Sequence, residues 1–340
     1  MRGFESKVQI VLVTGCAGFI AAKVVELLCH NTETTVVGVD NLNRYYDPTL
    51  KTHRLKKLSQ LPNFQFVELD IEDRVGLGQV FDSHAFTAVM NLAARAGVRY
   101  SIERPHLYNA TNSGGSLNLL DEMRSRGISK YVLASTSSLY AGQEMPFKET
   151  LPVNTPISPY AASKKAAEVM AYAYHHLHEI DVSIVRFFTV FGPAGRPDMS
   201  YFRFIQWIYN DQPIRVFGDG EQSRDFTFVD DIARGTIAAL QPVGYEVFNL
   251  GGGKQPVSIN TIIKKLEVLL GKQATVHYEP EVKADMVSTW ADIEKARQLL
   301  DWRPIVSLDD GLQQTVNWFV KNLPWTAEIA ITTPMPDIND

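Results

Sequence analysis

The chain has 340 residues, of which 45% are hydrophobic and 21% charged, as is ordinary for a soluble globular protein. Its net charge of −5 excludes the basic surface that is typical of nucleic-acid-binding proteins. The two cysteines, Cys16 and Cys29, have no metal-ligand spacing, so we expect no metal site and a reducing compartment. We find no signal-peptide pattern and no apolar run of about 18 residues, so we expect a cytoplasmic protein without membrane spans.

Short apolar runs alternate with helical patterns through the first half of the chain. This alternation predicts an α/β fold with a doubly wound, parallel Rossmann sheet that carries helices on both faces. The predicted strands cover residues 8–15, 34–40, 64–70, 86–94, 130–135 and 182–188. The predicted helices cover residues 21–30, 75–81, 112–126 and 160–178.

The pattern changes after about residue 186, where Pro and Gly become frequent and the elements shorten. We predict a Rossmann domain over 1–185 and a smaller α/β lobe over 186–325, part of which returns to the Rossmann domain. The lobe contains a helix at 201–210, a strand at 214–217 and a helix that begins at 229. Residues 326–340 are expected to form a loosely held tail.

A glycine-rich motif, TGCAGFIAAK at 14–23, follows the first strand and opens the first helix. Gly15 permits a tight turn, and Gly18 lets the backbone approach a pyrophosphate at the helix N-terminus. Asp40 ends the second strand, where a carboxylate binds the adenosine ribose and repels a 2′-phosphate. The motif favours NAD over NADP, although a structural turn with an unrelated aspartate would give the same pattern. Ala21 replaces the usual third glycine and is small enough for close helix packing.

Other cofactor contacts are expected from residues that follow the glycines or end the strands. The carboxyl ends of parallel strands face the ligand crevice, so residues at 69–71 and 91–94 would lie beside the adenine and pyrophosphate. The predicted cofactor contacts here are Phe19, Ile20, Asn41, Asp70, Ile71, Leu92, Ala93 and Ala94.

Tyr160 and Lys164 lie one helical turn apart in SPYAASKKAAE at 158–168. A charged lysine and a bound nicotinamide would both lower the pKa of the phenol from about 10 toward neutrality, as a general base requires. Thr136 ends the strand at 130–135 and is placed to share the hydrogen bond of a substrate hydroxyl. Although an ordinary helix surface could show the same spacing, the combination of motifs favours hydride removal from a carbinol.

These motifs together resemble the extended short-chain dehydrogenase/reductase family. The resemblance rests on TGxxGFI, NLAA, STSSLY, YAASK and RDFTFVDD in this order and covers roughly residues 8–318. Within the family, DNLNRYYDPTLK, AGVRYSIE and GRPDM resemble UDP-glucuronate 4-epimerases.

The resemblance implies a catalytic set of Thr136, Tyr160 and Lys164 and adds Asn112 to the cofactor contacts. It also implies hydroxyl groups around a sugar carboxylate, which are those of Thr136, Ser137, Ser138 and Thr189. Arg196 and Arg224 would contact the nucleotide diphosphate, and Asp285 the uridine ribose. Arg99 would lie near the sugar or the nicotinamide, or would form a structural ion pair.

The residues that follow Thr136 distinguish the possible reactions. Related dehydratases carry Asp-Glu after this threonine and decarboxylases a nearby Glu, whereas this chain has Ser137 and Ser138. A hydroxyl cannot replace a carboxylate in proton transfer at neutral pH. The missing carboxylate therefore favours epimerisation, and the resemblance implies UDP-glucuronate as the substrate and UDP-galacturonate as the product. The expected course is transient C4 oxidation, rotation of the 4-keto sugar and re-reduction.

Four departures from the family pattern leave the sugar preference open. Asn91 and Arg95 stand where His and Gln are usual, and Ala141-Gly142 follows Tyr140 where Gly is usual. KADMVS at 283–288 replaces a familiar motif. The alternatives are a 4-epimerase of UDP-glucose or UDP-N-acetylglucosamine, a dehydratase or decarboxylase relative, and a catalytically idle NAD-binding regulator.

A homodimer is the expected assembly. The helices at 112–126 and 160–178 carry more apolar residues than one sheet face can cover: Leu117, Leu120, Val169 and Tyr172. Relatives pair these two helices across a two-fold axis.

Overall fold

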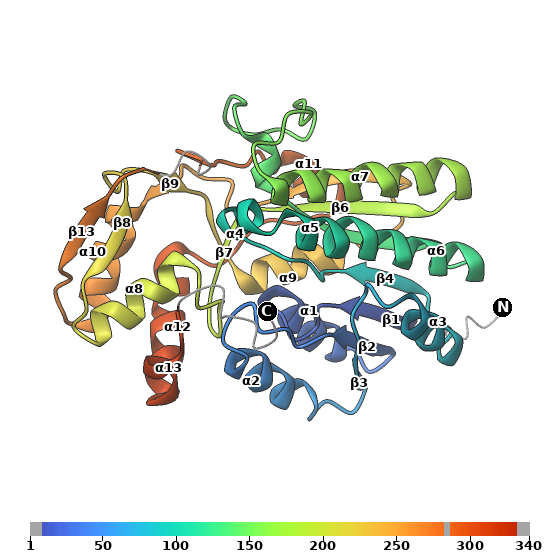
Figure 1. The fold of residues 1–340 in the computed structure, drawn as a ribbon, viewed down its shortest axis with the longest axis horizontal. Coiled ribbons are helices and arrows are strands. Elements are labelled where there is room, and N and C mark those ends of the chain that lie inside the picture. Colours follow the sequence, from blue (N-terminus) through green and yellow to red (C-terminus); the bar gives the residue numbers. More distant parts are fainter. Residues whose placement is uncertain (1–8, 282–285, 332–340) are drawn as a thin grey trace.

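The computed structural model describes residues 9–281 and 286–331 (Figure 1). Within them, parallel strands form a seven-stranded sheet in the order β11-β6-β5-β4-β1-β2-β3, which confirms the predicted fold class. The order reverses direction between β1 and β4, and ligands of such sheets bind at this switch point. The strands are β1 (Gln9–Thr14), β2 (Thr34–Asp40), β3 (Phe64–Glu68), β4 (Ala88–Asn91), β5 (Lys130–Thr136), β6 (Asp181–Phe187) and β11 (Tyr245–Leu250).

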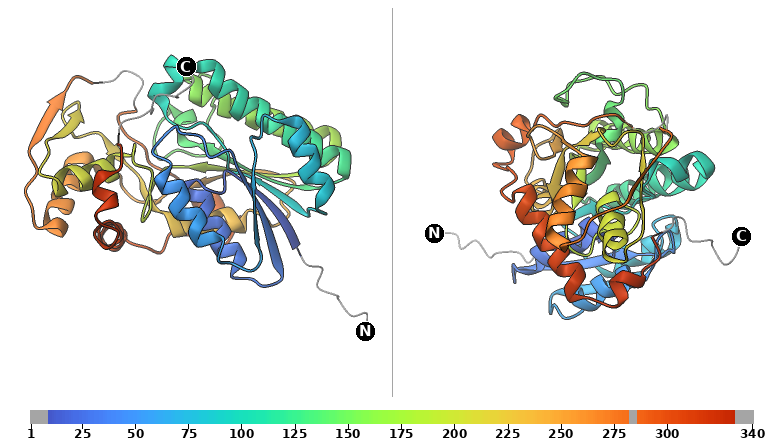
Figure 2. Two further views of the ribbon diagram at one scale, coloured as in Figure 1. Left: turned by 60° about the horizontal axis from the view of Figure 1, so that its bottom comes forward. Right: turned by 90° about the vertical axis from the view of Figure 1, so that its left-hand side faces the viewer.

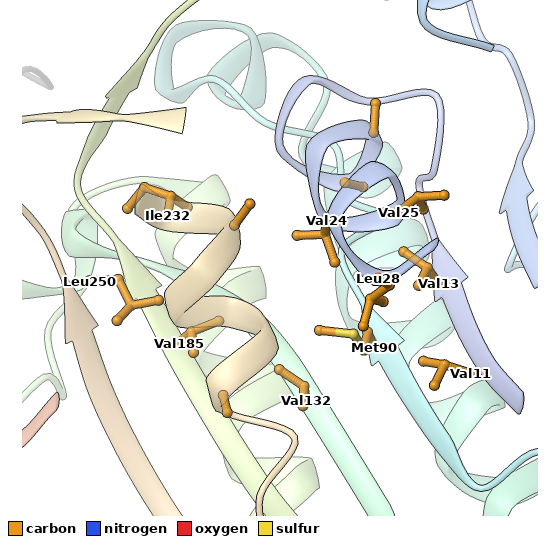
Figure 3. Close-up of a cluster of buried hydrophobic side chains, with 14 of the residues drawn as sticks. Val11, Val13, Val24, Val25, Leu28, Met90, Val132, Val185, Ile232 and Leu250 are labelled. Carbon is orange, nitrogen blue, oxygen red and sulfur yellow. The ribbon is translucent and has the colours of Figure 1, made fainter. Parts of the chain in front are cut away.

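Helices cover both faces of the sheet because the strand residues alternate between two apolar cores. Val11 and Val13 face a core with α1 (Phe19–Cys29) and α9 (Val229–Ala238), two helices that run side by side (Figure 3). Leu12 faces the opposite core. The helices of that face are α3 (Arg74–Ser83), α6 (Ser116–Arg126) and α7 (Pro159–His178).

Three elements beyond residue 186 belong to these layers. Strand β11 pairs with β6 at the sheet edge, α9 packs beside α1, and α11 (Glu294–Leu299) packs on β11. Most of the other elements surround a third core at the left of Figure 1. They include α8 (Ser200–Tyr209), β8 (Ile214–Phe217), α10 (Ile259–Leu270), β13 (Val276–Glu279) and α12 (Leu308–Lys321). The boundary at residue 185 stays a prediction.

Residues 326–331 are packed against the protein, so the prediction of a loose tail is wrong for this stretch. Thr326 and Ile329 are buried, and their carbonyls accept hydrogen bonds from Gln206 Nε2 at 3.1 and 2.8 Å. The backbone N–H of Ala330 donates to Asp47 at 3.1 Å. The short helix α13 (Trp325–Glu328) brings this segment onto α8 (Figure 2). Residues 332–340 lie outside the described part of the chain.

The helix predicted over 112–126 begins earlier, as a π-helical turn over Asn109–Gly115 that continues into α6. The sequence patterns missed α2 (Thr49–Leu58), α4 (Val98–Glu103) and α5 (Pro105–Tyr108) in the first half of the chain. In the second half they missed the helices α10, α11, α12 and α13, which follow α9. No helix in the described stretches 9–281 and 286–331 has the length and apolar character needed to cross a bilayer.

Arg54 on α2 joins the first loop of the sheet to the second lobe. Its buried guanidinium donates to the carbonyl of Ala17 at 2.9 Å and to that of Ala194 at 2.7 Å. Its Nη1 also donates to the Tyr46 hydroxyl at 2.9 Å. Since a buried cation needs such partners, we infer that Arg54 fixes the two loops relative to each other.

Candidate active site

A cleft of about 1760 Å³ opens between the carboxyl edge of the sheet and the second lobe. The predicted site residues that line it are Gly15, Gly18, Phe19, Ile20, Asp40, Asn41, Asp70, Ile71, Leu92, Ala93, Ala94, Arg99, Thr136, Ser137, Ser138, Tyr160, Lys164, Thr189, Arg196 and Arg224. Asn112 is buried behind the cleft wall and is not part of the lining. Asp285 lies outside the described residues.

The glycine loop closely approaches the strand end at 91–94. Gly15 has a φ of +69°, and a Cβ there would lie 2.8 Å from the Ala93 Cα. A Cβ on Gly18 would lie 2.8 Å from the carbonyl oxygen of Gly15. A side chain at either position would therefore collide with backbone. Because α1 begins directly after Gly18, the loop leaves helix N–H groups available to a pyrophosphate.

Asp40 is held in place by the backbone and by a lysine that the sequence analysis missed. Its carboxylate accepts hydrogen bonds from the N–H of Ala17 at 3.2 Å and of Leu42 at 2.8 Å. Lys51 Nζ on α2 lies 3.2 Å from the same carboxylate, and both side chains are buried. The lysine offsets part of the negative charge that we expected to repel a 2′-phosphate.

The catalytic residues predicted from β5 and α7 lie together. Ser158 caps α7 by accepting a hydrogen bond from the N–H of Ala161, which places Tyr160 in the first turn. The Thr136 hydroxyl donates to Ser138 Oγ at 3.1 Å and is placed to accept a hydrogen bond from the phenol. This arrangement can hold a substrate hydroxyl between a phenol and a threonine.

The protein's own charges do not produce the pKa that we expected for Tyr160. Burial raises its pKa, and hydrogen bonding with Thr136 and the charge of Arg196 oppose this only in part. Burial also lowers the pKa of Lys164 to about 8, against the opposing charge of Glu168. The expected fall of the phenol pKa toward neutrality includes the charge of a bound nicotinamide, so it stays a prediction for the NAD-bound protein.

A buried ion pair under the catalytic residues was also missed. Glu168 lies on α7 one turn after Lys164 and binds Arg186 of β6 through two contacts of 2.9 and 2.8 Å. It also accepts a hydrogen bond from Ser135 at 2.6 Å, next to Thr136. Any glutamate four residues after a lysine suits an exposed helix, so the sequence alone gave no sign of burial.

Two residues that depart from the family pattern have definite surroundings. Asn91 is buried and donates to Ser116 Oγ at 3.0 Å and to the Tyr131 hydroxyl at 2.9 Å. The side chain of Asn112 accepts a hydrogen bond from the backbone N–H of Arg95 at 2.8 Å and donates one to the carbonyl of Arg95 at 3.0 Å. The Arg95 Nε is buried without a hydrogen-bond partner among the described residues, and Arg95 lines the cleft. The loop after β4 thus brings a guanidinium to the cleft.

The arginines predicted for the substrate differ in their partners. Arg196 is bound by Asp198, with its Nε 3.0 Å from a carboxylate oxygen. Arg224 donates to the carbonyl of Ser223 at 2.8 Å. The guanidinium of Arg99 lies 4.1 Å from the centre of the Phe217 ring, so α4 reaches β8 across the cleft.

A family model described as the NAD-dependent epimerase/dehydratase family matches residues 11–251. The chain belongs to this family. The match spans the sheet, the glycine loop and the catalytic helix, which are the parts that line the cofactor end of the cleft.

Individual relatives match almost the whole chain. It is 56% identical over 320 residues to a UDP-glucuronate 4-epimerase of Thermodesulfobacterium geofontis (strain OPF15), covering 94% of this chain and 99% of that protein. The crystal structure of UDP-glucuronic acid 4-epimerase from Bacillus cereus with UDP-glucuronic acid and NAD matches with a TM-score of 0.87 and 38% identity, covering 93% and 100%. A Thermotoga maritima UDP-glucose 4-epimerase with UDP-glucose matches with a TM-score of 0.86 and 32% identity, covering 93% and 100%.

The residues of the cleft fit the NAD of this epimerase family. The two glycines leave space where a Cβ would intrude, and Asp40 and Asp70 end or follow neighbouring strands of the same edge. Asn41 Nδ2 donates to Asp70 at 2.5 Å and so links these two strand ends.

The burial of Lys164 predicts a pH-dependent stability difference. Its pKa is about 8 in the fold against an ordinary value of 10.5, so the unfolded chain binds more protons between these pH values. The free energy of unfolding of the wild type should therefore gain about 3 kcal/mol relative to Lys164→Met as the pH rises through this window. Between pH 7 and pH 10, the stability of Lys164→Met relative to the wild type should be largest at pH 7.

Urea unfolding of nucleotide-free protein at pH 7 and pH 10 measures this difference. Lys264→Met, at an exposed position of α10, serves as the control, because its side chain is solvated in both states. A difference between wild type and Lys164→Met that does not change with pH would contradict the assignment.

Proposed function

We propose that this protein is an NAD-dependent 4-epimerase that converts UDP-glucuronate to UDP-galacturonate. One observation carries the proposal, namely a Tyr160–Thr136–Ser138 hydroxyl cluster in the cofactor cleft with no carboxylate at 137 or 138. This cluster can oxidise a carbinol and bind a sugar carboxylate, and it lacks the group that elimination requires. The similarity to two UDP-glucuronate 4-epimerases supports the same substrate.

Each part of the cleft has a role in the proposed reaction. NAD, when bound at the glycine loop, accepts a hydride from C4 of the sugar and later returns it. Tyr160 takes the proton of the C4 hydroxyl and gives it back, with Thr136 orienting that hydroxyl. Arg196 and Arg224 anchor the diphosphate while the 4-keto sugar turns its other face. Lys164, one turn from the phenol on α7, would add a positive charge on the same side of the cleft.

Product analysis after incubation with UDP-glucuronate tests the reaction, and Tyr160→Phe tests its base. The variant keeps the ring and loses the proton acceptor, so turnover should fall about 100-fold or more with NAD still bound. Incubation with UDP-glucose and UDP-N-acetylglucosamine tests the neutral-sugar alternatives. Near-normal turnover of Tyr160→Phe would remove this residue from its role, and an absence of UDP-galacturonate would remove the proposed substrate.

Ser137, Ser138 and Thr189 are proposed to select a carboxylate over a hydroxymethyl group at C5. Hydrogen bonds to a charged group are worth about 1.5–3 kcal/mol, so Ser138→Ala should lower kcat/KM on UDP-glucuronate about tenfold or more. Any activity on UDP-glucose should change little. Steady-state kinetics on both substrates provide the comparison. Equal wild-type efficiency on the two sugars would contradict the assignment of the carboxylate.

We also propose a cytoplasmic homodimer. Both cysteines are free and buried, which suits a reducing compartment. Val169 and Tyr172 are 55% and 53% exposed on α7, whereas Leu120 is fully buried and cannot contribute to a surface as first expected. Leu117 is partly buried on the neighbouring helix α6.

Mass measurement in solution at micromolar concentration tests the assembly. The wild type should be dimeric, and Val169→Glu should shift it toward monomer by placing a charge in an apolar contact. Val268→Glu is the matched control, because Val268 is 82% exposed on α10 in the second lobe. A monomeric wild type, or equal effects of both variants, would refute the proposed interface.

A further inference from the structure

Arg203 is a cleft residue to which neither the sequence motifs nor the resemblance gave a role. It lies on α8 between Phe202 and Ile205, and these two neighbours are buried in the core of the second lobe. Arg203 itself is only partly buried and lines the cleft. The helix thus anchors its apolar face in the core and presents a guanidinium to the cleft.

The C-terminal segment holds this guanidinium by one edge. Arg203 Nε donates a hydrogen bond of 3.1 Å to the carbonyl of Ile331, which also lines the cleft. Across residues 9–281 and 286–331, no carboxylate lies within ion-pair distance of Arg203. The two terminal amino groups are therefore available for an anion in the cleft.

The charges around Arg203 favour such an anion. Burial and the positive charge of Arg99 lower the pKa of Arg203, and Asp198 opposes them. Asp198 itself is engaged by Arg196, the residue predicted to contact the diphosphate. Much of the charge of Arg196 is thus balanced within the protein. Arg224 alone would then face a diphosphate with two negative charges, so a further cation in the same region would strengthen binding.

We propose that Arg203 is a substrate-positioning residue that binds the diphosphate of the nucleotide sugar together with Arg196. The proposal rests on the proposed function, since it takes a UDP-sugar as the ligand. The forked guanidinium suits phosphate oxygens, and its hydrogen bond to Ile331 orients it. Two arginines on separate elements, the loop before α8 and α8 itself, then hold the diphosphate while the sugar turns.

Binding of UDP and of uridine to the holoenzyme, measured by titration calorimetry, tests the proposal. Arg203→Gln should weaken UDP binding about tenfold or more, because a charge-assisted contact is lost, while uridine binding stays unchanged. Arg203→Lys should lie between wild type and Arg203→Gln. Arg297→Gln, on the exposed helix α11 (Glu294–Leu299), removes the same charge far from the cleft lining and should bind UDP as wild type.

Three results would overturn the proposal. In the first, Arg203→Gln binds UDP as tightly as the wild type. In the second, its affinities for UDP and for uridine fall equally, which would assign Arg203 to the uridine instead of the diphosphate. A loss for UDP-glucuronate without a loss for UDP would assign Arg203 to the sugar carboxylate instead. Equal thermal midpoints and NAD contents of the variants exclude unfolding as the cause. If wild type binds UDP but does not convert UDP-glucuronate, the proposed function fails and the diphosphate assignment stands.

Discussion

The buried ion pair between Glu168 and Arg186 connects the catalytic helix to the sheet. Arg186 also donates to the Tyr140 hydroxyl at 2.7 Å, and that hydroxyl donates to Asn249 of β11 at 2.8 Å. One polar network therefore joins α7, β6 and the edge strand. An unpaired charge at this depth would cost several kcal/mol, so the network tolerates few alternative arrangements. The positions of Thr136 and Tyr160 depend on it, since Ser135 binds the same glutamate.

Lys164 lies in the same buried region, where the low dielectric destabilises its charged form. Burial disfavours its charge, and the nearest compensation comes from Glu168, which Arg186 already binds. A site that only had to be stable would place an apolar residue here. Lys164 lies one turn from Tyr160, so the proposed chemistry explains its presence better than the stability of the fold does.

Features encoded by short stretches could be predicted from the sequence. Six of the seven strands of the sheet, the glycine loop and the spacing of Tyr160 and Lys164 each depend on neighbours within one element, and the cleft brings them together. The edge strand β11 was missed, because it lies in the irregular second half of the chain. Features that depend on distant contacts could not be predicted. Lys51 reaches Asp40 from a helix that the patterns missed, and Asp198 binds Arg196 within a loop whose turn no pattern specifies. The pKa of Tyr160 likewise depends on burial, which a spacing of residues does not reveal.

The two lobes are tied together through α2 and the loop directly before it, and this has a consequence for the proposed epimerisation. Arg54 links Ala17 of the glycine loop to Ala194, and Asp47 binds the N–H of Ala330 in the segment that also holds Arg203. A 4-keto sugar must turn while its diphosphate stays fixed, so the anchoring groups must not move with it. Links that run through backbone carbonyls and a buried cation resist such motion more than exposed ion pairs, which contribute little. We therefore expect the rotation in the proposed reaction to be confined to the bonds of the substrate.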